Sequence, residues 1–201
     1  YRPDRGKMLS AEQIAGLGKF LRYLDPDGDG IPYRTLPGIS PKAAYFTRGS
    51  GHNRYGVYTE DSAEYQDVMD RLVRKFRTAA RLVPPAVVEG RSAPVGIVSL
   101  GSCDAPVREA LAMLRRSGTA IDYLRVRGFP FGAEVDEFLA AHQTVFVVEQ
   151  NRDAQLRSLL VLETSVNKQK LRSILHYNGL PMSAACIVDG VNSALAKEVA
   201  A

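Results

Sequence analysis

The sequence predicts an α/β protein in which a parallel-sheet domain follows a region of helices and one long loop. From Pro94 onward, short apolar runs alternate repeatedly with stretches of helical period. The runs are mostly apolar along their length, which is typical of strands in a sheet that helices cover on both faces. Before Pro84, two stretches of helical period flank a segment that shows neither period.

The first predicted helix covers residues 9–23, and a long loop follows it. Ser10 and Gln13 form a capping box, and apolar residues then recur at helical spacing. Residues 25–60 contain six glycines, four prolines and four tyrosines, without a sustained period. A loop of this length within a compact protein is usually functional or disordered, and its aromatic residues argue against plain disorder because they can bury surface.

The second predicted helix begins at Asp61 or Ser62, either of which can cap it, and ends before Pro84. Its apolar residues follow the spacing i, i+3, i+4, i+7, i+8 and i+11, which places them on one face. Basic residues, among them Arg71, occupy the other face. Residues 86–93 are predicted to be a linker to the sheet domain.

Four βα units are predicted in the sheet domain. Asp104 and Pro106 open the first helix, and Ser183 caps the last one. The strands are expected at residues 95–100, 121–126, 144–148 and 173–176. Their alternation with helices predicts a parallel sheet.

Composition points to a folded protein without a membrane span or a nucleic-acid partner. The 201 residues are 45% hydrophobic and 24% charged, and their apolar runs are far shorter than the roughly 20 residues that cross a bilayer. The formal net charge is +4, and the excess lies in residues 1–93, with 15 basic and 11 acidic side chains. Because no nucleic-acid-binding motif accompanies it, this excess is interpreted as helix surface and an anion site.

The two cysteines exclude several classes of protein. Cys103 and Cys186 are 83 positions apart and lack a CxxC partner. This excludes a disulfide framework, a zinc ribbon and a self-contained iron–sulfur site, and it favours a reducing cytoplasm. The first residues contain neither an initiator Met nor a signal peptide, so the chain is expected to begin within a longer protein.

An acidic segment at the start of the long loop resembles part of a calcium site. Asp25, Asp27, Asp29 and Gly30 match positions 1, 3, 5 and 6 of an EF-hand loop. The twelfth position, which should supply a bidentate glutamate, is Leu36. A turn-forming acidic loop is therefore favoured over calcium binding.

The same loop holds candidate anion-binding side chains. Arg34, Arg48, His52 and Arg54 can together hold a carboxylate or a phosphate through charge-assisted hydrogen bonds. The alternative is that they are solvated loop residues. Serine hydrolysis is not expected, because the Gly-x-Ser-x-Gly elbow is missing.

The carboxyl ends of the predicted strands are the expected ligand edge of a parallel sheet. Gly101 and Ser102 follow the first strand, where a tight turn with an aspartate cap is favoured over a phosphate loop because GxGxxG is absent. Glu149, Asn151 and Arg152 follow the third strand. They are candidates for an interface, and a helix-capping turn with Asn151 or Asp153 as the cap is an equal alternative.

Several long motifs resemble one family, the α subunits of 2-oxoacid:ferredoxin oxidoreductases, particularly the 2-oxoglutarate type. They include DGDGIPYRTLPG at 27–38 and LHYNGLP at 175–181. The resemblance covers essentially the whole chain. The other segments that carry it are residues 45–49, 51–52, 58–61, 69–76, 122–126 and 148–153.

The resemblance implies a thiamine-diphosphate enzyme that decarboxylates a 2-oxoacid, reduces ferredoxin through a [4Fe-4S] cluster and transfers the acyl group to coenzyme A. In this family the diphosphate, its magnesium ion and the cluster belong mainly to a separate β subunit, so this chain is expected to bind no cofactor alone. Residues 1–88, with loop 25–60, would be the tail of a pyrimidine-side domain. Residues 89–201 would form a domain like the transketolase C-terminal domain.

The resemblance transfers few residue roles. It places the long loop near the active site, where Arg34, Arg48 and His52 would hold a dicarboxylate or the phosphates of coenzyme A. No catalytic residue and no metal ligand is expected in the chain, which would be inactive by itself. The alternative is a non-catalytic assembly domain, and an independent calcium- or nucleotide-binding domain is disfavoured by Leu36 and by the missing glycine-rich loop.

Overall fold

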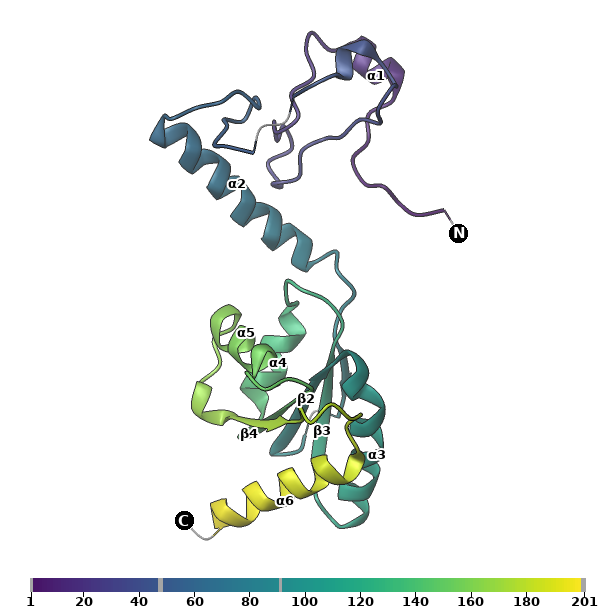
Figure 1. Ribbon diagram of the computed structural model, residues 1–201, viewed down its shortest axis with the longest axis vertical. Coiled ribbons are helices and arrows are strands. Elements are labelled where there is room, and N and C mark those ends of the chain that lie inside the picture. The colour runs from purple at the N-terminus through teal and green to yellow at the C-terminus, as the bar shows by residue number, and fades with distance from the viewer. Residues whose placement is uncertain (1, 47–48, 91, 200–201) are drawn as a thin grey trace. The chain divides into compact units, whose positions relative to one another are not determined.

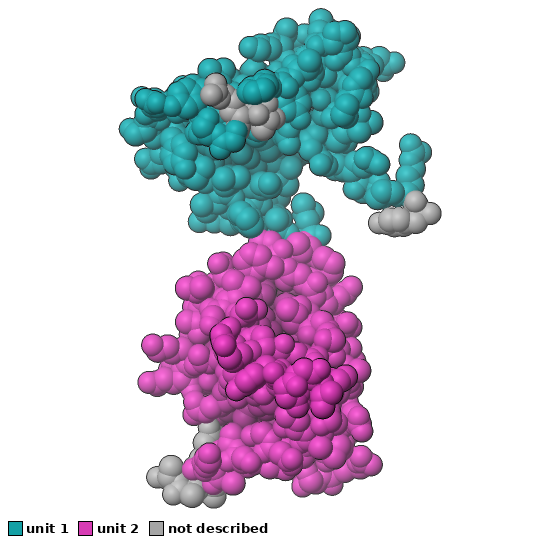
Figure 2. Space-filling view, viewed as in Figure 1, with its two compact units in different colours: residues 1–82 teal, residues 83–201 magenta. Residues whose placement is uncertain are grey.

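The computed structural model describes residues 2–46, 49–90 and 92–199, with side chains described as far as residue 197. The chain divides into two compact units, Tyr1–Leu82 (unit 1) and Val83–Ala201 (unit 2), which Figure 2 shows in different colours. Each unit is described by itself.

Unit 1 begins with a much shorter helix than the sequence predicts. The helix α1 covers Ala11–Ala15, and the predicted capping box of Ser10 and Gln13 is present. The prediction of a helix over residues 9–23 is wrong, because the helix ends at Gly16. Gly16 and Gly18 each disfavour a helix by roughly 1 kcal/mol relative to alanine, although the apolar spacing continues beyond them.

The long helix of unit 1, α2 (Ser62–Ala80), begins at the predicted cap, where the Asp61 side chain accepts a hydrogen bond from the Glu64 backbone. Its burial differs from the prediction. Arg71, expected on the solvent face, is only 7% exposed, whereas much of the apolar stripe is exposed. The exposed stripe residues are Tyr65, Met69, Val73 and Phe76.

The face of α2 that carries Arg71 packs against the acidic loop. Arg71 Nη1 donates to the carbonyl oxygen of Gly30 at 3.0 Å, and Thr78 Oγ1 donates to that of Asp29 at 2.6 Å. Gly30 has a positive φ of 85°, and a Cβ built on it would lie 2.2 Å from the backbone nitrogen of Lys75. Glycine is therefore required for this close approach.

The rest of the long loop is held by turns and short pairings. It contains the 3-10 helix η1 (Pro41–Ala43) and two isolated bridges, one between Met8 and Arg34 and one between His52 and Tyr58. Asn53, which is 9% exposed, accepts hydrogen bonds through Oδ1 from the backbone N–H groups of Tyr55 and Val57. The Asn53 side chain thus satisfies backbone N–H groups that have no partner in a regular helix or strand.

Unit 2 is a five-stranded sheet in the order β1-β3-β2-β4-β5 with helices on both faces (Figure 1). The strand β1 pairs antiparallel with β3, and the other pairs are parallel. The strands are β1 (Val87–Glu89), β2 (Val95–Leu100), β3 (Ile121–Val126), β4 (Thr144–Glu149) and β5 (Leu171–Leu175). The helices are η2 (Gly101–Cys103), α3 (Asp104–Arg116), α4 (Ala133–Ala141), α5 (Gln155–Glu163), η3 (Lys168–Lys170) and α6 (Ala184–Val199).

The predicted fold class, a mostly parallel α/β sheet domain after helices and a long loop, is confirmed. Two local predictions are wrong. The expected linker contains β1, whose backbone pairs with β3 from Val87 to Glu89, and the last strand lies at 171–175 instead of 173–176. The pairing with β4 begins at Leu171, which is buried at this edge.

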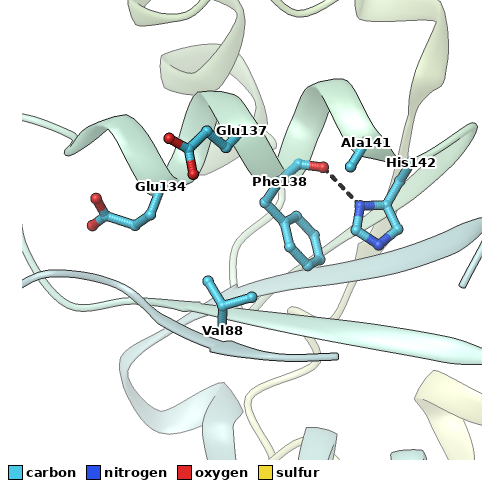
Figure 3. Close-up of a pocket in the computed structure, with 6 residues that line it drawn as sticks. All are labelled: Val88, Glu134, Glu137, Phe138, Ala141 and His142. Atoms are coloured by element: carbon cyan, nitrogen blue, oxygen red, sulfur yellow. Dashed lines mark hydrogen bonds between the residues drawn. The ribbon is translucent and has the colours of Figure 1, made fainter. Parts of the chain in front are cut away.

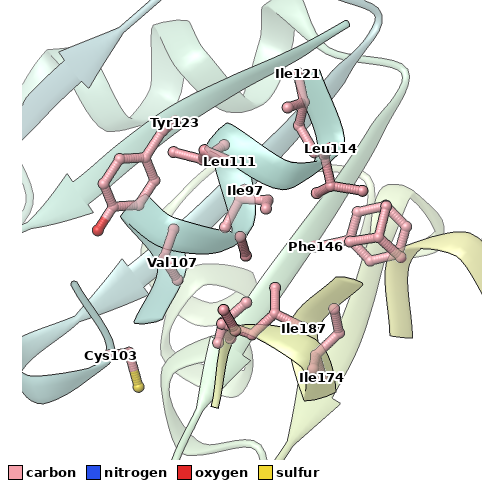
Figure 4. Close-up of a cluster of buried hydrophobic side chains, with 14 of the residues drawn as sticks. Ile97, Cys103, Val107, Leu111, Leu114, Ile121, Tyr123, Phe146, Ile174 and Ile187 are labelled. Atoms are coloured by element: carbon pink, nitrogen blue, oxygen red, sulfur yellow. The ribbon is translucent and has the colours of Figure 1, made fainter. Parts of the chain in front are cut away.

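Two apolar clusters cover the two faces of the sheet. Ile97 of β2 belongs to the cluster that includes residues of α3 and α6, which Figure 4 shows in part. Val98, the next residue, belongs to the cluster that includes residues of α4 and α5. Each fully buried aliphatic side chain contributes roughly 1.5–3 kcal/mol to stability, so these clusters hold the carboxyl ends of the strands in place.

Candidate functional site

The acidic loop of unit 1 surrounds a lysine. Lys7 Nζ lies 2.6 Å from Asp27 Oδ2 and 2.7 Å from Asp29 Oδ2, and it donates to the carbonyl oxygen of Ile31 at 3.1 Å. The hydrogen bond from Lys7 is the main cause that lowers the pKa of Asp29. Although desolvation by burial opposes it, the hydrogen bonds and charges of both aspartates raise the pKa of Lys7.

The third aspartate of this loop forms a turn. Asp25 accepts hydrogen bonds from the backbone N–H groups of Gly28 and Gly30, at 3.1 and 2.8 Å. This is the geometry of a turn-forming acidic loop. Within residues 2–46, 49–90 and 92–199, the structure contains no group of three or more His, Cys, Asp or Glu side chains arranged to hold a metal ion.

Arg34 anchors the N-terminal segment to the long loop. Its backbone N–H donates to the carbonyl oxygen of Lys7, and its own carbonyl oxygen accepts from the N–H of Leu9, both at 2.9 Å. Its guanidinium donates to the carbonyl oxygen of Arg5. Arg34 is an exposed residue, and a guanidinium has five N–H donors, so it keeps donors for an anion.

His52 makes a different set of contacts. Its ring stacks on Tyr23, with the ring centroids 4.0 Å apart and the planes at 21°. Its Nδ1 lies 2.9 Å from the carbonyl oxygen of Asn53. The partners described for His52 differ from those described for Arg34, so the structure does not join the two predicted residues in one contact. Arg48, the third, lies outside the described residues.

Arg71 is a buried cation, although the sequence predicted it on the solvent-exposed face of its helix. Its Nη1 bonds to Gly30, and its Nε is buried without a hydrogen-bond partner. Desolvation by burial lowers the pKa of Arg71; the charge of Asp25 opposes this shift, and the charges of Arg22 and Arg74 add to it. Arg71 therefore lies near two other cations, Arg22 and Arg74, as well as near Asp25.

In unit 2, Glu149 caps the helix that follows its strand. It is 4% exposed and accepts hydrogen bonds from the backbone N–H groups of Leu156 at 2.6 Å and Arg157 at 3.1 Å. Asn151 Nδ2 also donates to it, at 2.8 Å. A carboxylate at this place satisfies donors that the first turn of α5 leaves free, and it interacts favourably with the helix dipole. A helix-capping turn is therefore present, but its main acceptor is Glu149 instead of the expected Asn151 or Asp153; of the N–H groups of α5, Asn151 Oδ1 accepts only that of Gln155, at 3.3 Å.

Arg152 of the same cluster faces solvent. Its side chain is 74% exposed, and its Nε lies 2.7 Å from Oδ1 of Asp153. Such exposed pairs contribute little to stability. A role of Glu149, Asn151 and Arg152 at an interface stays a prediction.

The turn after β2 is tight, as the sequence predicted, but Asp104 is not the predicted cap of α3. Asp104 is the first residue of that helix, and the N-cap residue, Cys103, makes no side-chain capping bond. Asp104 instead accepts hydrogen bonds from the Tyr123 hydroxyl at 2.9 Å and from Arg108 Nε at 3.1 Å. Burial raises the pKa of Tyr123, whose hydroxyl also lies 2.6 Å from Ser99 Oγ.

The carboxyl edge of the sheet carries a groove of about 700 Å³. Gln150, after β4, donates through Nε2 to Ser102 Oγ, after β2, at 2.9 Å. The segment between β5 and α6 supplies most of the remaining wall. The lining residues are Ser102, Pro106, Gln150, His176, Tyr177, Gly179, Leu180, Pro181 and Met182. The sequence predicted a ligand edge at the carboxyl ends of the strands, but not this groove. The wall of the groove depends on how the segment between β5 and α6 folds back.

A second cavity, of about 240 Å³, lies beside α4 (Figure 3). His142, which is 1% exposed, lines it, with Nδ1 2.7 Å from the carbonyl oxygen of Phe138 and Nε2 3.2 Å from Asp122 Oδ2. Asp122 also accepts from the Ala93 N–H at 2.9 Å. Asp122 therefore ties the segment after β1 to the sheet. Asp122 and His142 are 20 residues apart in the sequence, so no local sequence pattern predicts their contact.

Comparison with known proteins identifies a family. No protein family model matches the chain. The chain is 36% identical over 170 residues to 2-oxoacid:ferredoxin oxidoreductase 2, subunit alpha, of Aeropyrum pernix, covering 79% of this chain and 26% of that protein. It is 26% identical over 174 residues to 2-oxoacid:ferredoxin oxidoreductase subunit alpha of Saccharolobus solfataricus, covering 81% and 27%. The chain is homologous to part of a 2-oxoacid:ferredoxin oxidoreductase α subunit.

A solved structure agrees with this assignment. The 2-oxoglutarate:ferredoxin oxidoreductase from Magnetococcus marinus, with 2-oxoglutarate, coenzyme A and succinyl-CoA bound, matches with a TM-score of 0.78 and 28% identity. The match covers 89% of this chain and 31% of that chain. The resemblance predicted from the motifs is confirmed. The chain spans about a quarter of the length of the curated α subunits that it matches.

The residues of this α-subunit homologue do not fit the metal groups that the family implies. A [4Fe-4S] cluster needs about four cysteine thiolates, and the chain has two cysteines, of which Cys103 is buried and Cys186 half-buried. The described residues also contain no metal-binding group of His, Cys, Asp and Glu. Among the described residues, no helix has both the length and the apolar character needed to cross a membrane.

Proposed function

We propose that the chain forms part of the α subunit of a thiamine-diphosphate-dependent 2-oxoglutarate:ferredoxin oxidoreductase. The complex would oxidatively decarboxylate the 2-oxoacid to an acyl-CoA and pass electrons to ferredoxin. The match to the Magnetococcus marinus enzyme supports this most directly, because it covers 89% of the chain and therefore extends over residues of both units. A β subunit would carry the thiamine diphosphate, the magnesium ion and the cluster, in a reducing cytoplasm.

Within this function, the long loop of unit 1 would hold an anionic group of the substrate or of coenzyme A. Arg34 is exposed and keeps free donors, and His52 presents an imidazole stacked on Tyr23. Arg22 and Arg74 add positive charge near Arg71. Arg48 belongs to this proposal from the sequence. These residues would bind and orient an anion, and none of them carries a chemical step.

The alternative is an assembly domain without a binding role. Two contacts favour it: the guanidinium of Arg34 already donates to Arg5, and His52 already stacks on Tyr23. Under this alternative both side chains only hold the loop together. The two functions differ in whether the loop side chains affect substrate affinity.

The proposed function is tested by reconstitution with a β subunit. A 2-oxoglutarate:ferredoxin oxidoreductase α subunit that contains this chain is co-purified with the β subunit, and ferredoxin reduction is followed with 2-oxoglutarate and coenzyme A. We expect activity that requires both subunits and both substrates, and none from the 201-residue chain alone. Ferredoxin reduction by the chain alone, or equal activity without it, contradicts the proposal.

The anion site is tested in the same complex. Arg34→Ala and Arg48→Ala should each raise KM for 2-oxoglutarate or for coenzyme A about tenfold, the loss of about 1.4 kcal/mol of binding. Arg152→Ala, which removes an exposed arginine of unit 2, is the matched control and should leave both KM values unchanged. If the loop variants assemble with unchanged KM values, the assembly alternative is correct.

A further inference from the structure

The groove in unit 2 lies where open parallel sheets bind ligands. The strand β2 lies between β3 and β4, and α3, after β2, contributes to one apolar cluster while α5, after β4, contributes to the other. The chain therefore leaves these two neighbouring strands toward opposite faces, which opens a crevice between their carboxyl ends. Ser102 follows β2 and Gln150 follows β4, and both line the groove.

One wall of the groove contains a histidine whose tautomer is fixed by its surroundings. His176 Nε2 lies 2.9 Å from the carbonyl oxygen of Leu180. A carbonyl oxygen only accepts hydrogen bonds, so Nε2 carries the proton. In the neutral ring Nδ1 is then an acceptor, and it faces Cys186 Sγ at 3.9 Å. Leu180 therefore orients the ring so that its basic nitrogen points at a thiol, the arrangement of a nucleophile, a base and an orienting group.

The thiol has a second favourable feature, and it lies next to the groove, against His176, rather than among the residues that line it. Cys186 lies in the first turn of α6, where Ser183 Oγ accepts a hydrogen bond from its backbone N–H at 3.3 Å. The positive end of a helix dipole favours a developing thiolate. Cys186 is half-buried, whereas Cys103 is 3% exposed and burial raises the pKa of its thiol. Cys103 is thus an internal control for the reactivity of Cys186.

The chemistry of the wall limits the reaction partner. None of the residues that line the groove is an arginine, a lysine or an acid, and the exposed side chains of Tyr177 and Leu180 offer apolar surface. An uncharged group fits this wall better than a phosphate does. We propose that Cys186 and His176 form a thiol-exchange site whose partner is a small disulfide with uncharged arms.

The step is a thiol–disulfide exchange. His176 Nδ1 takes the proton of the Cys186 thiol as its sulfur attacks one sulfur of the small disulfide. The disulfide bond breaks, a mixed disulfide forms on Cys186, and the leaving thiolate takes the proton from His176. One disulfide is consumed and one is formed, so no other oxidant is needed. The proposal concerns unit 2 alone and is independent of the proposed oxidoreductase function.

The test measures exchange with 2-hydroxyethyl disulfide on the 201-residue chain, by intact mass and peptide mapping. We expect one mixed disulfide, at Cys186, with Cys103 unmodified in the native protein. Cys186→Ser should abolish the adduct and Cys103→Ser should leave its rate unchanged. His176→Ala should slow exchange about tenfold or more, and imidazole added to the buffer should restore the rate, which a purely structural role of the histidine would not produce.

A second variant separates loss of the base from loss of the fold. His176→Gln has an amide NH₂ that can still donate to the carbonyl oxygen of Leu180 but lacks a basic nitrogen, and it should be as slow as His176→Ala with native circular dichroism. Exchange at equal rates at both cysteines, an adduct only on Cys103, or an unchanged rate in natively folded His176 variants would overturn the proposal.

Discussion

Unit 1 and unit 2 are stabilised in different ways. Most buried apolar side chains that the structure describes belong to unit 2, where two clusters cover the sheet. The buried apolar residues described in unit 1 are Ile14, Phe20, Ala43 and Val68. Unit 1 relies more on polar contacts between distant segments, such as those of Lys7 with Asp27 and of Arg71 with Gly30.

This difference matters because the two kinds of interaction respond differently to mutation. An apolar cluster loses stability roughly in proportion to the volume removed, whereas a polar contact that remains partly solvated contributes little. We therefore expect the largest single effects in the sheet of unit 2. In unit 1 we expect large effects only where the backbone itself is constrained.

The sheet core should show the largest effect. Leu124 of β3 is fully buried in the second cluster, which includes residues of α4 and α5, and Leu124→Ala should lower the free energy of unfolding by about 2–5 kcal/mol. Leu162→Ala removes the same group from a side chain that is 78% exposed and should cost less than about 0.5 kcal/mol. Urea unfolding measures both, and equal losses would show that unit 2 is not held by this core.

The acidic loop provides the next largest effect. Gly30→Ala places a Cβ against the backbone of Lys75 and forces a positive φ on alanine, so it should destabilise unit 1 by about 2–3 kcal/mol. Gly28→Ala also forces a positive φ, but its Cβ meets nothing within 4 Å, and it should cost only about 1 kcal/mol. Hydrogen exchange of peptides from α2 measures the change within unit 1. Equal protection in both variants would mean that the loop does not pack on α2.

The regular part of the fold could be predicted from sequence because each local pattern agreed with the final structure. The strands at 95–100 and 121–126 have the predicted bounds. The strand β1 was missed because three residues carry too short a pattern. The first helix was predicted too long because apolar spacing continues past Gly16, where the low helix propensity of Gly16 and Gly18 ends the helix.

The candidate sites were harder to predict because they depend on contacts between distant residues. Glu149 was found because a polar residue directly after a buried strand is unusual, but its helix-capping role required the path of the chain into α5. Lys7 is 20 positions from Asp27, and no periodic pattern connects them. The pair of His176 and Cys186 depends on the turn between β5 and α6, which sequence periodicity does not describe.

The cap of α5 should show an intermediate effect. Glu149→Gln keeps the size of the side chain but replaces an acceptor oxygen with an NH₂ group that faces backbone donors. We expect a loss of about 1–2 kcal/mol of unfolding free energy. Glu163→Gln, an exposed change at the other end of α5, is the control and should change stability by less than about 0.5 kcal/mol. A neutral Glu149→Gln would show that water or Asn151 replaces the cap.

The smallest effect is expected at Lys7, and its sign depends on pH. The pKa of Asp29 is lowered in the folded protein, so its contribution is present above the ordinary carboxyl value and is lost as the pH falls below about 4. Lys7→Met should cost only about 0.5 kcal/mol at pH 6, because the pair is partly exposed, and it should reduce the loss of stability between pH 6 and pH 3. Lys7→Arg, which keeps the charge, should retain the acid dependence in hydrogen exchange of residues 25–31. A loss of several kcal/mol in Lys7→Met would instead show that one polar contact can hold unit 1 as firmly as the apolar core holds unit 2.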